Sequence, residues 1–135
     1  MDSPIQNLHY AIGELAYCMA KIDGKVQKEE REKFHEIVVS ELEDDYDFNI
    51  SDIVFHIMEK DKTDSVSSYN WAINEIKMNS HYLSPELKGK FISVMEKIAN
   101  AYPPVTMEEK DILKKFKKDI APINGDPVFY LKTVR

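Results

Sequence analysis

The chain has 135 residues, of which 43% are hydrophobic and 31% are charged, and its formal net charge is −6. This length and composition are typical of one globular domain that buries about two thirds of its unfolded surface. The only cysteine, Cys18, excludes an internal disulfide and favours a reducing compartment. Because no apolar run approaches the ~18 residues of a membrane span and the start lacks a signal-peptide pattern, we expect a cytoplasmic protein without membrane insertion.

Charge is unevenly distributed along the chain. Residues 1–65 carry a net charge of −9, whereas residues 66–135 carry +3. The acidic half is therefore expected to attract cations or a basic partner. The isoelectric point of about 5.2 argues against a nucleic-acid partner. We interpret a late group of lysines as a solvated helix face: Lys110, Lys114, Lys115, Lys117 and Lys118.

Apolar residues spaced three and four apart predict a helix at the start of the chain. They occupy positions 5, 8, 12, 15, 19 and 22, with Ser3 as the expected cap and Pro4 in the first turn. The same spacing predicts a second helix over about 28–42 and a third over about 51–60.

Three further helices follow in the second half of the chain. The fourth is expected from Val66 onward, with Trp71 packed against its neighbours, and the fifth begins at Pro85. A capping box formed by Thr106 and Glu109 opens the sixth. The predicted core consists of Leu8, Ile12, Leu15, Met19, Phe34, Ile37, Phe91, Met95, Ile98, Leu113 and Phe116.

The last segment breaks the helical pattern. Pro122, an Asn-Gly pair and Pro127 forbid one continuous helix, and an apolar strip follows from Val128 to Val134. This strip either packs on the helices of its own chain or docks on a second copy. We therefore expect a helical domain over residues 1–121 and an extended apolar C-terminal tail over residues 122–135.

The sequence contains a degenerate internal repeat. A shift of 79 residues places AKIDGKVQKEEREKF on ANAYPPVTMEEKDIL. Both segments join one amphipathic helix to the next through a short turn, so we interpret the chain as two related helix-turn-helix units around a middle section. The identical positions are Ala20, Val26, Glu29 and Glu30 in the first copy and Ala99, Val105, Glu108 and Glu109 in the second.

The first copy has two interpretations. As a helix junction, Gly24 ends one helix in the left-handed conformation, Val26 fills the core and acidic residues favour the next helix N-terminus. As a weak cation site, Asp23 and Glu30 supply the oxygen ligands that suit magnesium, manganese or calcium. Both interpretations stay open.

Several kinds of chemistry are excluded by spacing. A calcium loop of the EF-hand type would need carboxylates where Met19 and Lys21 stand. A zinc helix of the HExxH type that begins at His35 would need a second histidine in place of Val39. The sequence also lacks a Gly-rich phosphate loop and a Gly-x-Ser-x-Gly motif. We therefore predict no catalytic residues and no resident cofactor.

The chain resembles the TerB-like domains of bacterial tellurite-resistance proteins in a helix that ends in AYCMAKIDGKV and is followed by QKEEREKF. Such domains also occur at the start of some membrane-bound co-chaperones. The resemblance covers residues 5–121. It implies an all-helical bacterial protein with a binding role in metal or oxyanion stress, in which acidic residues hold divalent cations. Carried over to this chain, the candidate metal ligands are Asp23, Glu30 and Glu109.

The chain departs from this family pattern in its second copy, where Tyr102 and Pro103 stand in place of Asp-Gly. A separate acidic run follows the second predicted helix. It is either a solvated connector or a group that gathers a hard cation. Its members are Glu41, Glu43, Asp44, Asp45 and Asp47.

Together these patterns predict an all-α, single-domain bundle of about six helices with an internal helix-turn-helix repeat. The predicted function is non-enzymatic binding of a partner protein or, weakly, of a divalent cation. The alternative is a structural or regulatory homodimer without a ligand that associates through residues 122–135.

Overall fold

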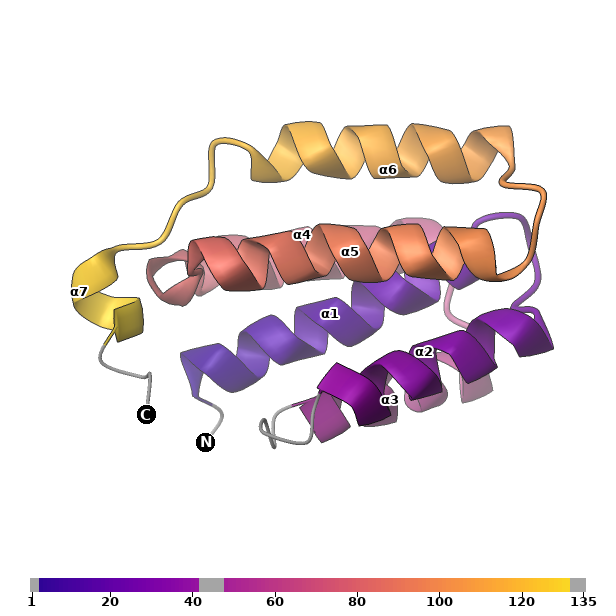
Figure 1. Ribbon diagram of the computed structural model, residues 1–135, viewed down its shortest axis with the longest axis horizontal. Helices are drawn as coiled ribbons and strands as arrows, with labels where there is room; N and C mark the ends of the chain where they lie inside the picture. The colour runs from indigo at the N-terminus through magenta and orange to yellow at the C-terminus, as the bar shows by residue number, and fades with distance from the viewer. Residues whose placement is uncertain (1–2, 42–47, 132–135) are drawn as a thin grey trace.

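The computed structural model describes residues 3–41 and 48–131. These residues form a bundle of helices without a strand, which confirms the all-α prediction (Figure 1). Their helices are α1 (Pro4–Lys21), α2 (Lys28–Glu41), α3 (Phe48–Lys60), α4 (Ser65–Met78), the short 3-10 helix η1 (Ser80–Tyr82), α5 (Pro85–Ala101), α6 (Met107–Ile120) and α7 (Pro127–Tyr130).

Side-chain caps fix several helix starts. The Ser3 hydroxyl accepts a hydrogen bond from the backbone N–H of Gln6 at 3.1 Å, and the Gln6 side chain accepts one from the Ser3 N–H at 3.0 Å. The predicted capping box of α6 is also confirmed. Asp64 caps α4, which begins one residue earlier than expected, and α3 begins at Phe48 rather than near residue 51.

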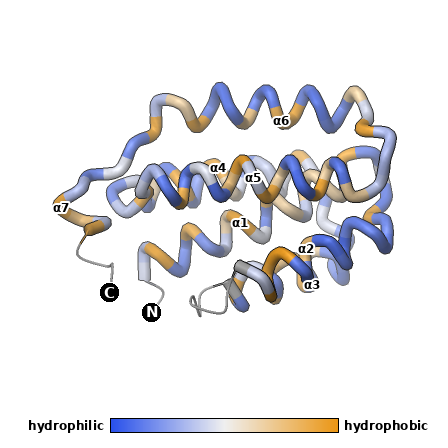
Figure 2. The backbone as a smooth tube through the Cα atoms, viewed as in Figure 1, coloured by the Kyte–Doolittle hydropathy of each residue, from blue (hydrophilic) through white to orange (hydrophobic). Residues whose placement is uncertain are grey.

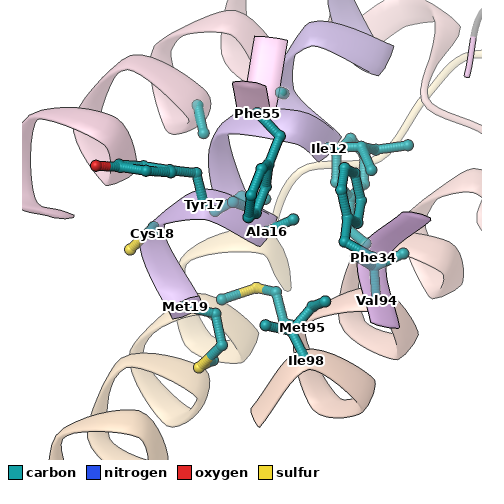
Figure 3. Packing of buried hydrophobic residues seen from close by; sticks show 14 of the residues in the cluster. Ile12, Ala16, Tyr17, Cys18, Met19, Phe34, Phe55, Val94, Met95 and Ile98 are labelled. Carbon is teal, nitrogen blue, oxygen red and sulfur yellow. The ribbon is translucent and has the colours of Figure 1, made fainter. Parts of the chain in front are cut away.

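Helix α1 lies at the centre of the bundle and packs against α2, α3, α4 and α5. It is buried nearly all round, as expected of a central helix. Figure 3 shows Phe34 and Phe55 beside it, with ring centroids 5.0 Å apart. The predicted core is confirmed except at Leu113, which is only partly buried. Cys18 is fully buried.

Helix α6 lies on the outside of the bundle against α5 (Figure 1). Phe116 anchors it in the core, with its ring centroid 6.2 Å from that of Phe91 and 6.4 Å from that of Tyr69. The rest of α6 is mostly hydrophilic, as Figure 2 shows, and its five lysines are exposed as predicted.

The expected packing of Trp71 is wrong, because 52% of this side chain is exposed. The buried side of α4 is formed by residues spaced one, three and four apart, and position 71 lies off that stripe. The buried residues are Ser68, Tyr69, Ala72 and Ile76.

The C-terminal segment is not wholly extended, since Pro127–Tyr130 forms α7. Asp126 caps this helix by accepting a hydrogen bond from the N–H of Val128 at 2.9 Å, and Pro127 suits its first turn. The ring of Phe129 packs on η1, with centroid distances of 5.1 Å to His81 and 5.6 Å to Tyr82. Residues 122–131 therefore return to their own chain, and Val134 lies outside the described residues.

Candidate functional site

The two copies of the repeat place their turns at the same end of the molecule (Figure 1). The turn between α1 and α2 lies beside the turn between α5 and α6, whereas α7 lies at the opposite end. Segments about 79 residues apart in the sequence are thereby brought together. This paired junction is the candidate site.

The first turn has the geometry expected of a helix junction. Gly24 has a φ of 104°, and its N–H donates to the Lys21 carbonyl at 2.7 Å. The Lys21 ammonium donates in turn to the Gly24 carbonyl at 3.0 Å. Val26 is buried against the core. The predicted roles of Gly24 and Val26 are confirmed.

Glu30 lies in the first turn of α2 with only 1% of its surface exposed. Its Oε1 atom accepts a hydrogen bond from the N–H of Gln27 at 2.9 Å. Burial raises the pKa of Glu30 to about 7, although this backbone hydrogen bond opposes the change. The nearby charges of Asp23, Glu109 and Glu29 contribute to this increase.

Glu109 occupies the matching position in α6 and is 2% exposed. Its Oε1 atom accepts a hydrogen bond from the N–H of Thr106 at 2.8 Å, and the Thr106 hydroxyl oxygen accepts one from the N–H of Glu109 at 3.1 Å. Burial raises the pKa of Glu109, the hydrogen bonds from Thr106 oppose this, and the charges of Asp23 and Glu108 add to the increase. Both buried glutamates therefore cap the helices in which they lie.

Among the three candidate metal ligands carried over from the resemblance, the charges of Asp23 and Glu109 act on Glu30, and the charge of Asp23 acts on Glu109. Asp23 is exposed, and its charge raises the pKa of both Glu30 and Glu109. Further carboxylates also raise these pKa values, namely Glu29 for Glu30 and Glu108 for Glu109. The site therefore gathers negative charge at a place where two carboxyl groups are already buried.

The donor type at this site suits a hard divalent cation, because carboxylate oxygens are the ligands that magnesium, manganese and calcium prefer. The arrangement of these carboxylates suits a divalent cation less well. Within residues 3–41 and 48–131, no three His, Cys, Asp or Glu side chains are positioned to hold one ion. Since Glu30 and Glu109 each use one oxygen as a cap, a three-carboxylate site requires a side-chain movement, for which exposed Asp23 has the most freedom.

The separate acidic run gives no structural site. Glu43, Asp44, Asp45 and Asp47 lie outside the described residues, as does the side chain of Glu41. Neither the connector nor the cation interpretation of this run is tested.

A groove between α2 and α5 begins beside the junction, with a cavity volume of about 550 Å³. Sequence reasoning missed it, because the spacing of charges on α2 shows a polar face but not which helix lies opposite. The available signal was the acidic residues three and four apart on that face. The charged lining consists of Glu29, Glu32, Lys33, Glu36, Glu96 and Lys97.

In the part of the chain that the structure describes, no helix is both long enough and apolar enough to cross a membrane. A comparison of the chain with models of protein families, with curated proteins and with solved structures returns no match. Membership of the TerB-like family therefore stays a prediction from the sequence.

Proposed function

We propose that the protein is a non-enzymatic binding module whose junction site, formed by Asp23, Glu30 and Glu109, weakly binds a hard divalent cation. The observation that supports this function is the pair of buried carboxyl groups whose pKa values are raised by burial and by surrounding carboxylates, Asp23 among them. Burying ionised carboxylates without a cationic partner is costly, and strongly shifted pKa values are common at functional sites. A bound cation offsets the mutual repulsion of these carboxylates.

The residues of the junction have distinct roles in this proposal. Asp23 is exposed and supplies a carboxylate that solvent ions can reach, whereas Glu30 and Glu109 supply buried ones. Glu30 must lose its proton before its carboxylate can act as a ligand, and its pKa is about 7. Cation affinity is therefore expected to rise between pH 6 and pH 8.

Calorimetric titration of the chelator-treated protein with magnesium, manganese and calcium tests this function. We expect a Kd on the order of 1 mM, at the weak end for calcium modules. Asp23→Asn, Glu30→Gln and Glu109→Gln should each weaken binding about tenfold. The glutamine variants keep the Oε1 acceptor, so the helix caps are preserved.

Two neighbouring glutamates provide matched controls. Glu29 and Glu108 are exposed, and each lies one residue before a buried glutamate in the same helix turn. Each of these charges also raises the pKa of the buried glutamate beside it, but neither residue is a proposed ligand. Glu29→Gln and Glu108→Gln should therefore change the affinity by no more than about threefold, clearly less than the site variants. The proposal is rejected if no ion binds with a Kd below about 1 mM, or if the controls weaken binding as much as the site variants.

The link of this binding to metal or tellurite stress rests on the resemblance of residues 5–121 to TerB-like domains. Its cheapest test is gene neighbourhood, since a protein of that system is expected beside the other components. The homodimer is the second candidate function, supported by the exposed apolar side chains of Val128 and Leu131 on the C-terminal segment. Sedimentation of the intact chain and of a chain ending at residue 121 would reveal a dimer that depends on the tail.

A further inference from the structure

Two histidines and an aspartate meet where α2 packs against α3. The Nδ1 atom of His35 in α2 lies 3.6 Å from the Oδ2 atom of Asp52 in α3. The Nε2 atom of His56, one turn further along α3, lies 3.4 Å from the Oδ1 atom of the same aspartate. The sequence pattern that begins at His35 lacks a second histidine within its own helix. The packing of α2 on α3 supplies one from 21 residues later in the chain.

Two sets of contacts hold α2 and α3 together beneath and beside these side chains. Phe34 and Phe55, which directly precede the two histidines, are each 1% exposed and stack with their ring centroids 5.0 Å apart (Figure 3). The Nε atom of Arg31 in α2 donates to both carboxylate oxygens of Glu59 in α3 at 2.9 Å. The backbones that carry the histidines and the aspartate are therefore fixed relative to each other.

The distances between the donor atoms are closer to those of a zinc shell than to those of hydrogen bonds. An ordinary N–H···O hydrogen bond spans about 2.7–3.2 Å. Zinc binds nitrogen and oxygen ligands at about 2.0–2.2 Å, so neighbouring ligands of a tetrahedral ion lie about 3.2–3.5 Å apart. The imidazole-to-carboxylate distances of 3.4 and 3.6 Å are near this range.

The three side chains differ in their freedom to move. Asp52 contacts both imidazoles and has only 22% of its side chain exposed, whereas the side chains of His35 and His56 are 63% and 52% exposed. As they lie, the three side chains do not enclose one ion. Closure of the site therefore requires rotation of the two imidazoles toward Asp52. Exposed side chains change rotamer rapidly, so this rotation is accessible without movement of the helices.

We propose that His35, Asp52 and His56 form a binding site for a transition-metal ion such as zinc, with water as the remaining ligand. Two imidazoles and one carboxylate are an established set of protein ligands for zinc. Imidazole nitrogen suits zinc, nickel and copper, whereas magnesium and calcium prefer oxygen ligands alone. The site is distinct from the junction, whose candidate ligands are all carboxylates, and this inference does not depend on cation binding there.

Other residues that zinc favours are less suited to compete for the ion. Cys18 is fully buried, and burial raises the pKa of its thiol to about 12, so it stays protonated. His9 is 2% exposed, and its Nδ1 atom lies 2.8 Å from the Ile5 carbonyl oxygen. His81 is exposed but belongs to η1, outside α2 and α3.

The probe for this site is zinc itself, titrated into the chelator-treated chain by calorimetry, with magnesium titrated separately for comparison. We expect zinc to bind at least about tenfold more tightly than magnesium, because only zinc gains from the imidazole ligands. In NMR spectra of the histidine side chains, zinc should shift the imidazole signals of His35 and His56 and leave those of His81 unchanged.

Three substitutions remove one ligand each. His35→Gln, Asp52→Asn and His56→Gln should each weaken zinc binding about tenfold or more, since even the loss of a group that only supports a metal ligand costs about this much. Matched controls are His81→Gln and Asp111→Asn, which make the same chemical changes at exposed positions outside α2 and α3. Both controls should change zinc affinity by no more than about twofold.

A variant of the junction separates this site from the proposed function. Glu30→Gln removes a junction ligand and should leave zinc affinity within about twofold of the wild type. A tenfold loss in this variant, or zinc-induced shifts at the junction rather than at the two histidines, would assign the ion to the junction and overturn the inference.

Further results would also overturn the proposal. They are zinc affinity no greater than magnesium affinity, equal losses in the controls and the ligand variants, and sedimentation that shows a dimer formed only with zinc, which would mean that two copies share the ion. Circular dichroism verifies that each variant is folded. If Asp52→Asn fails to fold, the variants of the exposed residues His35 and His56 still decide, and unchanged zinc affinity in both rejects the site.

Discussion

The two helix junctions reach the same local geometry with different turn residues. In the first, Gly24 adopts a φ of 104°, whereas the second contains Pro103 and Pro104. Yet each ends on a buried glutamate whose Oε1 atom accepts the backbone N–H three residues earlier, at 2.9 Å for Glu30 and 2.8 Å for Glu109. The helix start therefore fixes the glutamate, while the turn before it is free to vary.

The difference in turn residues shows which junction residue is not needed for the turn to fold. The second copy forms its junction without an acidic residue in the turn, so folding of such a turn does not require Asp23. Asp23 is exposed, and its charge acts on both buried glutamates. Of the three site residues, Asp23 is therefore the one that the proposed cation binding explains better than folding does.

The two junctions also differ in how deeply the following helix is buried. Helix α2 packs against α1, α3 and α5, whereas α6 packs mainly on α5. The repeat places Phe34 of α2 opposite Leu113 of α6 in the alignment. Phe34 is 1% exposed and stacks on Phe55, but Leu113 is only partly buried.

The largest expected effect follows from this difference. Phe34→Ala should lower the free energy of unfolding by about 3–5 kcal/mol, because it leaves a cavity beside α1. Leu113→Ala should cost less than about 2 kcal/mol, since its site is partly open to water. Urea unfolding followed by circular dichroism measures both. Equal losses would show that the two copies are buried alike.

The second prediction concerns the pH dependence of stability. The folded-state pKa of Glu30, about 7, lies above the ordinary glutamate value of 4.5. The stability that neutral Glu30 contributes is therefore fully present below about pH 4.5 and is lost as pH rises to about 7. Glu30→Gln has no proton to lose, so its stability should not fall in this way. The difference in unfolding free energy between Glu30→Gln and the wild type should therefore shift in favour of the variant by about 1–3 kcal/mol from pH 4 to pH 8.

Comparison of the same variant at the second junction sharpens this test. The pKa of Glu109 is also raised, so Glu109→Gln should change stability in the same direction over a pH range that begins near 4.5. Unfolding experiments at pH 4 and pH 8 measure both differences. A Glu30→Gln effect that does not change with pH would contradict the raised pKa.

Local patterns predicted most of the helices, because each helix start depends on residues within one turn. The boxes at Ser3 and Thr106 and the left-handed conformation of Gly24 follow from such short-range chemistry. The repeat also placed Glu30 and Glu109 in equivalent positions, which the structure confirms.

Features that depend on which helices meet could not be predicted in this way. The effect of Asp23 on the pKa values of both Glu30 and Glu109 requires the two turns to lie side by side, which periodicity does not specify. The exposure of Trp71 depends on how α4 is rotated toward α1, and the groove depends on α2 lying beside α5. These are long-range properties of the packing.

The third prediction tests the turn conformation that only the first junction uses. Gly24→Ala should cost about 1–2 kcal/mol, because a side chain is strained at a φ of 104°. An added Cβ would meet no atom within 4 Å, so the cost is one of backbone conformation. Gly89→Ala is the control, because it adds a Cβ in equally open space within α5 and should stabilise that helix by about 0.5–1 kcal/mol. Thermal unfolding that shows the same sign for both variants would rule out this explanation.

The smallest expected effect distinguishes the two residues that precede the helices. The Thr106 hydroxyl accepts the N–H of Glu109, whereas the hydrogen bonds described for Gln27 involve its backbone and not its side chain. Thr106→Ala should therefore cost about 1 kcal/mol, the usual value of a side-chain cap. Gln27→Ala should cost less than about 0.5 kcal/mol, because its backbone N–H still donates to Glu30. Urea unfolding at pH 7 can distinguish the two losses in unfolding free energy. An equal loss for Gln27→Ala would mean that the Gln27 side chain caps α2 as the Thr106 side chain caps α6.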